Sequence, residues 1–246
     1  MDYSYQDSKA GQEYGEFSDS PDGQMQHRLI FDSIKPTLPK NPASVILDAG
    51  CGDGWLTAKL FNNYPNTEGF DVSPTLIEAA RQKSPNIKFA VADAAGELPY
   101  EKNSFDVIIA SLLLHNLENQ QQAYNNFYNL IKPSGHLLVI SVNPYYGYPV
   151  GVWKRGITGK LLNKKPQLQL RPYFKSMDAE RGGNWSGKNI PLRFSPLPEQ
   201  INCALSAKFQ LLSVQDLRTE AKNNVYDFNY RNSRFPLLLL LDFQKI

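Results

Sequence analysis

The chain has 246 residues, 41% of them hydrophobic, with a net charge of +2, which fits one large α/β domain and gives no reason to expect nucleic acid as a partner. Its longest apolar run, residues 236–241, is far shorter than the roughly 20 residues that span a bilayer. The two cysteines and a polar, acidic start without a signal-peptide pattern predict a cytoplasmic protein.

The first forty residues precede the core. Residues 1–23 are polar and rich in Tyr, Gly, Ser and Asp, which predicts a mobile arm or lid. Residues 25–34 carry apolar side chains at helical spacing and are followed by prolines, which predicts a helix that ends there. His27 lies on this helix, and we expect it at the surface.

Strands and helices alternate through the core, residues 41–142. The predicted strands are residues 45–49, 68–71, 87–91, 105–114 and 136–142, and the predicted helices are residues 55–62, 75–83 and 119–130. A turn at Pro133-Ser134-Gly135 precedes the fifth strand. Such alternation predicts right-handed crossovers and a parallel, doubly wound sheet, in which ligands bind beyond the carboxyl ends of the strands.

The second half of the chain breaks this rhythm and then resumes it. Residues 143–194 are rich in Pro, Gly, basic and aromatic residues. A long irregular stretch inside a compact domain is usually functional, so we expect an insert that caps the substrate site. Residues 195–246 add a helix near 198–207 and strands near 209–214 and 237–243. We therefore expect one domain over residues 1–246.

The most informative segment joins the first strand to the next helix. An apolar run ends at Asp48, and glycines follow at positions 50, 52 and 54. Such a turn lets backbone N–H groups approach a ligand at the positive end of a helix. A dinucleotide site favours G-x-G-x-x-G, and the position of its third glycine holds Trp55. The spacing therefore disfavours a nicotinamide-dependent oxidoreductase.

Two more carboxylates follow the next strands. Asp71 ends the second strand and Asp93 the third, so both are expected at the same edge of the sheet as the glycine turn. Asp71 could instead cap the helix that opens at Ser73, and Asp93 could only shape a turn. Taken with the glycine turn, the two residues favour one ligand cleft.

These segments resemble a known family. The glycine turn is similar to the signature loop of class I S-adenosylmethionine-dependent methyltransferases. Residues 45–142 are similar to the small-molecule, ubiquinone-biosynthesis-like branch (methyltransferase types 11 and 25). The matching segments are the glycine turn and residues 69–73, 91–94, 105–108 and 130–137. The resemblance implies a Rossmann-like, seven-stranded mixed sheet whose last strand is antiparallel, with an N-terminal helical arm and an insert after strand five.

The resemblance also implies which residues bind the cofactor, S-adenosylmethionine, whose product is S-adenosylhomocysteine. The glycine turn would hold the methionine part, Asp71 the ribose, and Asp93 with Ala94 the adenine. Tyr14 would close over the cofactor from the arm, unless the arm is a disordered tail. The full predicted set is Tyr14, Asp48, Ala49, Gly50, Cys51, Gly52, Gly54, Asp71, Val72, Asp93, Ala94, Ser111 and Leu112.

The acceptor is left open. His115, after the fourth strand, is either a general base, a substrate contact or a structural histidine of the core or rim, and no metal is expected. The predicted acceptor contacts are Asn143, Tyr145, Trp153, Tyr173 and Trp185. The resemblance predicts methylation of an O, N or C atom of a small molecule by a monomer or homodimer without a membrane span. The alternatives are a protein- or RNA-directed methyltransferase and a non-catalytic S-adenosylmethionine-binding partner protein.

Overall fold

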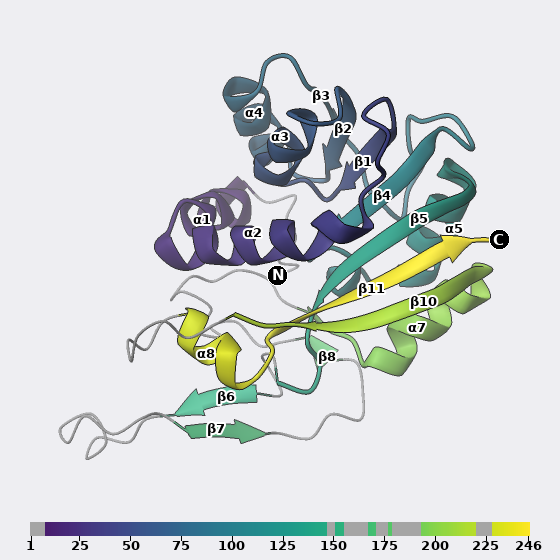
Figure 1. Ribbon diagram of the computed structural model, residues 1–246. Helices are drawn as coiled ribbons and strands as arrows, with labels where there is room; N and C mark the ends of the chain where they lie inside the picture. The colour runs from purple at the N-terminus through teal and green to yellow at the C-terminus, as the bar shows by residue number, and fades with distance from the viewer. Residues whose placement is uncertain (1–7, 147–150, 155–166, 171–176, 179–192, 220–227) are drawn as a thin grey trace.

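The computed structural model describes residues 8–146, 151–154, 167–170, 177–178, 193–219 and 228–246 (Figure 1). Seven of its strands form one sheet in the order β10-β11-β5-β4-β1-β2-β3. These strands are β1 (Val45–Ala49), β2 (Asn66–Asp71), β3 (Lys88–Val91), β4 (Phe105–Ser111), β5 (Ile131–Val142), β10 (Phe209–Leu217) and β11 (Leu238–Lys245). Strands β1 to β5 pair in parallel, whereas β11 is antiparallel to both β5 and β10. This confirms the predicted mixed sheet with an antiparallel last strand.

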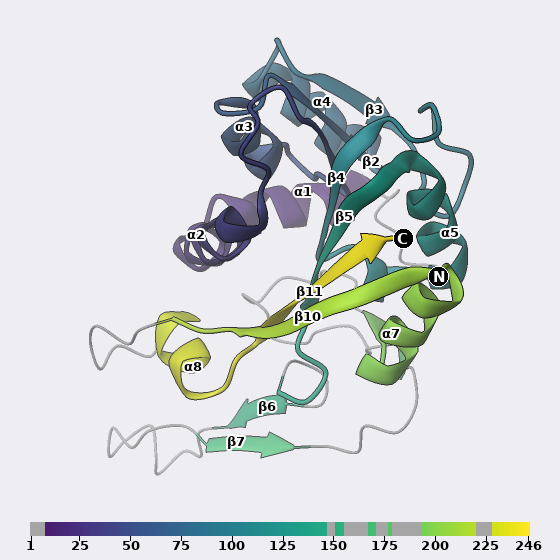
Figure 2. The ribbon, with the colours of Figure 1, turned by 45° about the vertical axis from the view of Figure 1, so that its right-hand side comes forward.

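Helices cover both faces of this sheet (Figure 2). They are α1 (Ser8–Ser18), α2 (Pro21–Ile34), α3 (Trp55–Phe61), α4 (Pro74–Lys83), α5 (Gln120–Leu130), α7 (Leu197–Ser206) and α8 (Phe228–Arg234), with short 3₁₀ turns η1 (Lys35–Thr37) and η2 (Leu114–Asn116). No helix among the described residues is long and apolar enough to cross a membrane.

Two apolar clusters explain why the central strands are apolar at nearly every position. On β4, Ile108 and Ala110 pack with α5 and α7 on one face of the sheet. Val107 and Ile109 pack with α2 and α3 on the other face. Side chains alternate across a strand, so a strand covered on both faces needs apolar residues at consecutive positions.

Two predicted boundaries move in the structure. The strand predicted at 105–114 ends as β4 at Ser111, because Leu112 takes a φ of 56° and turns the chain. The predicted turn at 133–135 lies within β5, where the pairing shifts from Ile131 opposite Phe105 to His136 opposite Val107. Ser134 has a φ of 62° there, so the predicted reversal is a bulge inside a longer strand.

Residues 8–18 form a helix that the composition of residues 1–23 did not predict, although the resemblance predicted a helical arm, and the movement of this arm as a lid remains a prediction. Helix α1 packs against α4 and α2, and its side chains Ala10 and Phe17 are buried. Ser20 caps α2 by accepting a hydrogen bond from the Gly23 N–H at 3.1 Å, with Pro21 at the first turn. Ala10, Tyr14 and Phe17 have helical spacing, so the signal was present but was outweighed by the polar composition.

The predicted insert contains short antiparallel pairs. Strand β6 (Gly151–Lys154) pairs with β7 (Gln167–Leu170), and β8 (Met177–Asp178) pairs with β9 (Arg193–Phe194). Trp153 lies in β6, whereas Tyr173 and Trp185 lie outside the described residues.

Candidate active site

The glycine turn between β1 and α3 has a left-handed backbone at each glycine. Gly50, Gly52 and Gly54 have φ values of 72°, 55° and 81°. There is also little room for a side chain at these positions. A Cβ atom on Gly50 would lie 3.0 Å from Leu113, and one on Gly52 would lie 3.0 Å from the Tyr14 ring. Both conditions require glycine, so the turn stays narrow, and its N–H groups at Gly50 and Gly54 donate to the Phe70 and Cys51 carbonyls.

Asp71 at the end of β2 fastens this turn to the neighbouring strand. Its Oδ2 accepts a hydrogen bond from the Gly52 N–H at 3.0 Å, and its Oδ1 accepts one from the Ser73 N–H at 2.9 Å. Burial raises the pKa of Asp71, and the backbone hydrogen bonds oppose that rise. An ionised carboxylate has about four lone-pair sites, so both oxygens can accept further hydrogen bonds.

Asp48, at the end of β1, is buried and accepts a hydrogen bond from the Thr57 hydroxyl at 2.6 Å. Burial raises the pKa of Asp48 to about 7, and the nearby Asp71 and Asp53 carboxylates add to the rise. The end of the sheet thus holds three buried carboxyl groups around one turn. Such a site favours a positively charged ligand.

A pocket opens over the glycine turn. Six of the predicted cofactor residues line it: Tyr14, Asp48, Gly50, Cys51, Ser111 and Leu112. The pocket therefore brings together α1, the turn and the end of β4, as predicted. The sequence interpretation missed another set of lining residues, which come mainly from α2 and the start of α3: Gln26, His27, Ile30, Asp53, Trp55 and Leu56.

Gln26 is the most informative of the missed residues. Its side chain is fully buried, yet neither its amide nitrogen nor its amide oxygen has a hydrogen-bond partner in the described part of the chain. A buried unpaired polar group costs about 1–3 kcal/mol, so such groups usually mark a water or ligand position. Gln26 precedes Ile30 and Ile34 at four-residue spacing, a signal that would have placed it on the inward face of α2.

The expected surface position of His27 was wrong. The residue is only 8% exposed, and its ring stacks on Trp55 with the centroids 4.5 Å apart. Burial lowers its pKa. The stack forms because α2 lies against the start of α3, a tertiary contact that helical spacing alone does not specify.

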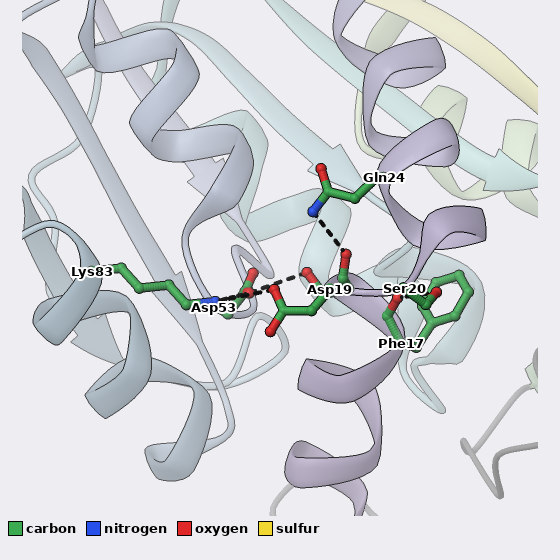
Figure 3. A network of polar contacts seen from close by, with 7 residues as sticks. Phe17, Asp19, Ser20, Gln24, Asp53 and Lys83 are labelled. Carbon is green, nitrogen blue, oxygen red and sulfur yellow. Dashed lines mark hydrogen bonds and ion pairs between the residues drawn. The ribbon is translucent and has the colours of Figure 1, made fainter.

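Polar contacts hold the α1–α2 corner against the glycine turn (Figure 3). Asp53 accepts hydrogen bonds from the Lys83 ammonium at 2.6 Å and from the Ser18 hydroxyl at 3.1 Å. Lys83, on α4, also lies 3.7 Å from Asp19, and Gln24 donates to the Ser18 carbonyl at 3.2 Å. Tyr14 and Gln26 are thereby held over the pocket by side chains from three separate segments.

Other predicted cofactor residues lie outside the pocket lining. Asp93 is exposed, and its Oδ1 accepts a hydrogen bond from the Ala95 N–H at 2.9 Å, so the side chain shapes a turn. Ala94 is buried beside it, and Val72 is half-buried after Asp71. A Cβ on Gly54 would meet Ala80 and Phe89 at 3.0 Å, so this glycine permits close packing. Ala49, Gly52 and Asp71 are also outside the lining. Cofactor contacts at all of these residues remain predictions.

On the predicted acceptor side, His115 lies in η2 and is almost fully buried, and burial lowers its pKa to about 4. Asn143 donates from Nδ2 to Asp216 at 3.1 Å and accepts from the Tyr145 N–H at 3.0 Å, an arrangement that serves the turn after β5. The Tyr145 side chain is 43% exposed. Acceptor contacts at these residues remain predictions.

Comparisons with known proteins agree with this geometry. The methyltransferase-domain family model matches residues 47–139. Malonyl-(acyl-carrier protein) O-methyltransferase 1 of Ilyobacter polytropus is 31% identical over 97 residues, which are 37% of this chain and 35% of that protein. The ubiquinone/menaquinone biosynthesis C-methyltransferase of Cereibacter sphaeroides is 29% identical over 121 residues, 46% of this chain and 48% of that protein. The matched region thus spans less than half the length of both relatives.

The fold extends the likeness beyond the matched region. The crystal structure of a putative S-adenosylmethionine-dependent methyltransferase from Listeria monocytogenes superposes with a TM-score of 0.74 over 91% of this chain and 99% of that chain, at 21% sequence identity. The strand order, the glycine turn and the family match all indicate a methyltransferase fold. Residues 47–139 therefore match the methyltransferase-domain family, and the chain as a whole has the fold of that S-adenosylmethionine-dependent methyltransferase.

Proposed function

We propose that this protein transfers a methyl group from S-adenosylmethionine to a small-molecule acceptor. The single observation that carries the proposal is the pocket over the glycine turn, whose lining combines the unpaired Gln26 amide with the buried carboxyl groups of Asp48 and Asp53. S-adenosylmethionine supplies a methyl group on a positively charged sulfur and an amino acid end with an ammonium and a carboxylate. The pocket has a matching set of donors and acceptors.

Each side chain has a distinct role in this proposal. Asp71 accepts hydrogen bonds from the ribose hydroxyls with its remaining lone pairs. Gln26 can donate to a carboxylate and accept from an ammonium, which suits the amino acid end. Tyr14 and Trp55 enclose the pocket and exclude water, and methyl transfer is an in-line displacement that depends on orientation and water exclusion.

The relatives support the class of acceptor. One is named for O-methylation of malonyl-(acyl-carrier protein) and the other for C-methylation in ubiquinone and menaquinone biosynthesis. Both names describe methylation of a small chemical group, although one group is held on a carrier protein. They differ in the acceptor atom, one oxygen and the other carbon, so the proposal leaves the atom open.

Thermal unfolding with cofactor tests the proposal. At a concentration one hundred times its Kd, S-adenosylmethionine is expected to stabilise the fold by about 2.7 kcal/mol, and S-adenosylhomocysteine should also stabilise it. A metabolite panel assayed for S-adenosylhomocysteine release then identifies the acceptor. A flat titration with both compounds would contradict the proposal, whereas binding without turnover of any acceptor would favour the non-catalytic partner protein.

Cofactor binding should also depend on pH through Asp48. Its folded-state pKa of about 7 exceeds the ordinary value of about 4, so the folded chain holds a proton that the unfolded chain releases between these values. The contribution of Asp48 to the stability of the free protein should therefore be fully present below the lower value and be lost as the pH rises through about 7. A bound cation favours the ionised carboxylate, so the affinity for the cofactor should rise as the pH increases through about 7.

Calorimetry in two buffers of different ionisation enthalpy, just below the Asp48 pKa, measures this linkage. Wild-type protein should release a proton on binding. The Asp48→Asn variant keeps an oxygen for Thr57 but should release none. Equal proton release by both proteins would show that Asp48 is not the linked group.

A further inference from the structure

A second group of buried polar side chains lies away from the glycine turn. We call it the α5–α7 polar cluster, and its members are His115, Gln120, Tyr124, Ser195 and Gln200. All are at most 5% exposed. The described residues provide no hydrogen-bond partner for either ring nitrogen of His115, the amide oxygens of Gln120 and Gln200, or the hydroxyls of Tyr124 and Ser195.

The topology places this cluster at the edge of the sheet where ligands bind. Helix α5 precedes β5 and α7 precedes β10, and both strands run antiparallel to β11 and so point the same way. Both helices therefore begin at the carboxyl edge, where Gln120 is the first residue of α5 and Gln200 lies in the first turn of α7. His115 follows β4 at the same edge.

Packing brings the members together. Helix α5 packs against η2 and against α7, and β9, which directly precedes Ser195, packs against η2. The Gln121 amide donates to the Cys203 carbonyl at 3.1 Å, which joins α5 to α7. The Gln200 amide donates to the Ser195 carbonyl at 2.8 Å. The cluster is thus a shared interior of η2, α5 and the start of α7.

The cluster also adjoins the cofactor pocket. Leu112, which lines that pocket, is three residues before His115, and its carbonyl accepts a hydrogen bond from Asn116 of η2 at 3.0 Å. A molecule bound at the cluster would therefore lie next to the end of β4, which is shared by both sites.

The chemistry of the unpaired atoms indicates what would bind. A buried polar group without a partner destabilises the fold, so a protein that keeps five of them together needs a water or ligand to pair them. Both glutamine oxygens are acceptors only, and a neutral imidazole adds another acceptor. Burial lowers the pKa of His115 to about 4, so it is neutral near pH 7. The cluster contains no carboxylate to pair a cationic ligand.

We propose that the α5–α7 polar cluster binds the acceptor, and that the acceptor is an uncharged compound bearing hydroxyl groups. This proposal rests on the proposed function. A hydroxyl donates to the unpaired oxygens and to a neutral histidine nitrogen. A charged acceptor would lose its hydration without gaining an opposite charge among these side chains.

The free protein provides a first test that needs no acceptor. Gln120→Leu removes an unpaired buried oxygen with little change of shape, so it is expected to raise the melting temperature. The control is Gln122→Leu, on the exposed face of α5, which should leave the melting temperature nearly unchanged. A lower melting temperature of Gln120→Leu would show that this oxygen is paired in the folded protein, which would overturn the proposal.

The second test is the binding of small probes. The readout is the change in the imidazole ¹⁵N chemical shifts of His115, measured with and without S-adenosylmethionine. Phenol should bind saturably, whereas toluene, which lacks the hydroxyl, and benzoate, which is charged, should not. His115→Phe and Gln200→Leu should each weaken phenol binding roughly 10-fold, which is the loss expected when one hydrogen bond is removed. Gln122→Leu should not weaken phenol binding.

The outcomes separate this proposal from the proposed function. Unchanged phenol binding in His115→Phe, no saturation, or equal binding of benzoate would overturn the acceptor site even where S-adenosylmethionine binds normally. No cofactor binding by calorimetry, with the phenol response intact, would contradict the proposed function alone. Phenol exclusion from the wild-type cluster would indicate a site for structural water only.

Discussion

Replacing Asp71 by Asn is expected to weaken S-adenosylmethionine binding roughly 10- to 100-fold, because the ribose would lose a charge-assisted hydrogen bond worth about 1.5–3 kcal/mol. The substitution keeps the side-chain volume and one acceptor oxygen. Its amide group cannot accept from both the Gly52 and the Ser73 N–H groups, so the glycine turn should also loosen. Isothermal titration calorimetry with S-adenosylmethionine measures the loss.

Asp93→Asn is the matched control, since Asp93 is also a carboxylate that follows a strand of the same sheet but is exposed. It should weaken binding less than Asp71→Asn does. Thermal unfolding of both variants without cofactor separates lost affinity from lost stability. Wild-type affinity in a folded Asp71→Asn protein would reject the ribose role.

Replacing Gly23 by Ala is expected to separate α1 from α2 and to destabilise the protein by more than about 1–3 kcal/mol, the usual range for overpacking a core. A Cβ atom at Gly23 would lie 2.1 Å from the Phe17 carbonyl oxygen and 2.9 Å from that of Ser18. These are backbone atoms, so the corner between the helices must open. Tyr14 and Gln26 would then move away from the pocket, and cofactor affinity should fall with stability.

Gly15→Ala is the control, because Gly15 lies within α1 and a Cβ there has no atom within 4 Å. Alanine is favoured over glycine inside a helix by roughly 0.5–1 kcal/mol, so this variant should be slightly more stable than wild type. Hydrogen exchange of the α1 amides should be faster in Gly23→Ala and slower or unchanged in Gly15→Ala. Equal exchange in both variants would show that the corner does not hold α1 in place.

Much of the fold followed from local patterns in the sequence. Apolar runs of strand length between amphipathic helices predicted the parallel core, and the structure confirms it with shifts of a few residues at the boundaries. The glycine turn and Asp71 were predicted together, because alternate glycines before a helix and a carboxylate at the next strand end serve one ligand in a doubly wound sheet. These features depend on short segments and on the rule that parallel strands end at one edge.

The side chains that complete the site depended on tertiary contacts. Helical spacing marks Gln26 as inward-facing, but only the packing of α2 against α3 places its unpaired amide over the glycine turn. His27 is buried for the same reason, since its ring stacks on Trp55.

The α5–α7 polar cluster joins residues up to 85 positions apart, from His115 to Gln200, and no local pattern relates them. By itself the sequence determined the sheet and the glycine turn, because these are encoded in local periodicity and motif spacing, and its resemblance to a known family implied the class of cofactor. Only the tertiary structure decided which polar groups remain buried without a partner, because burial depends on what packs against each element from distant parts of the chain.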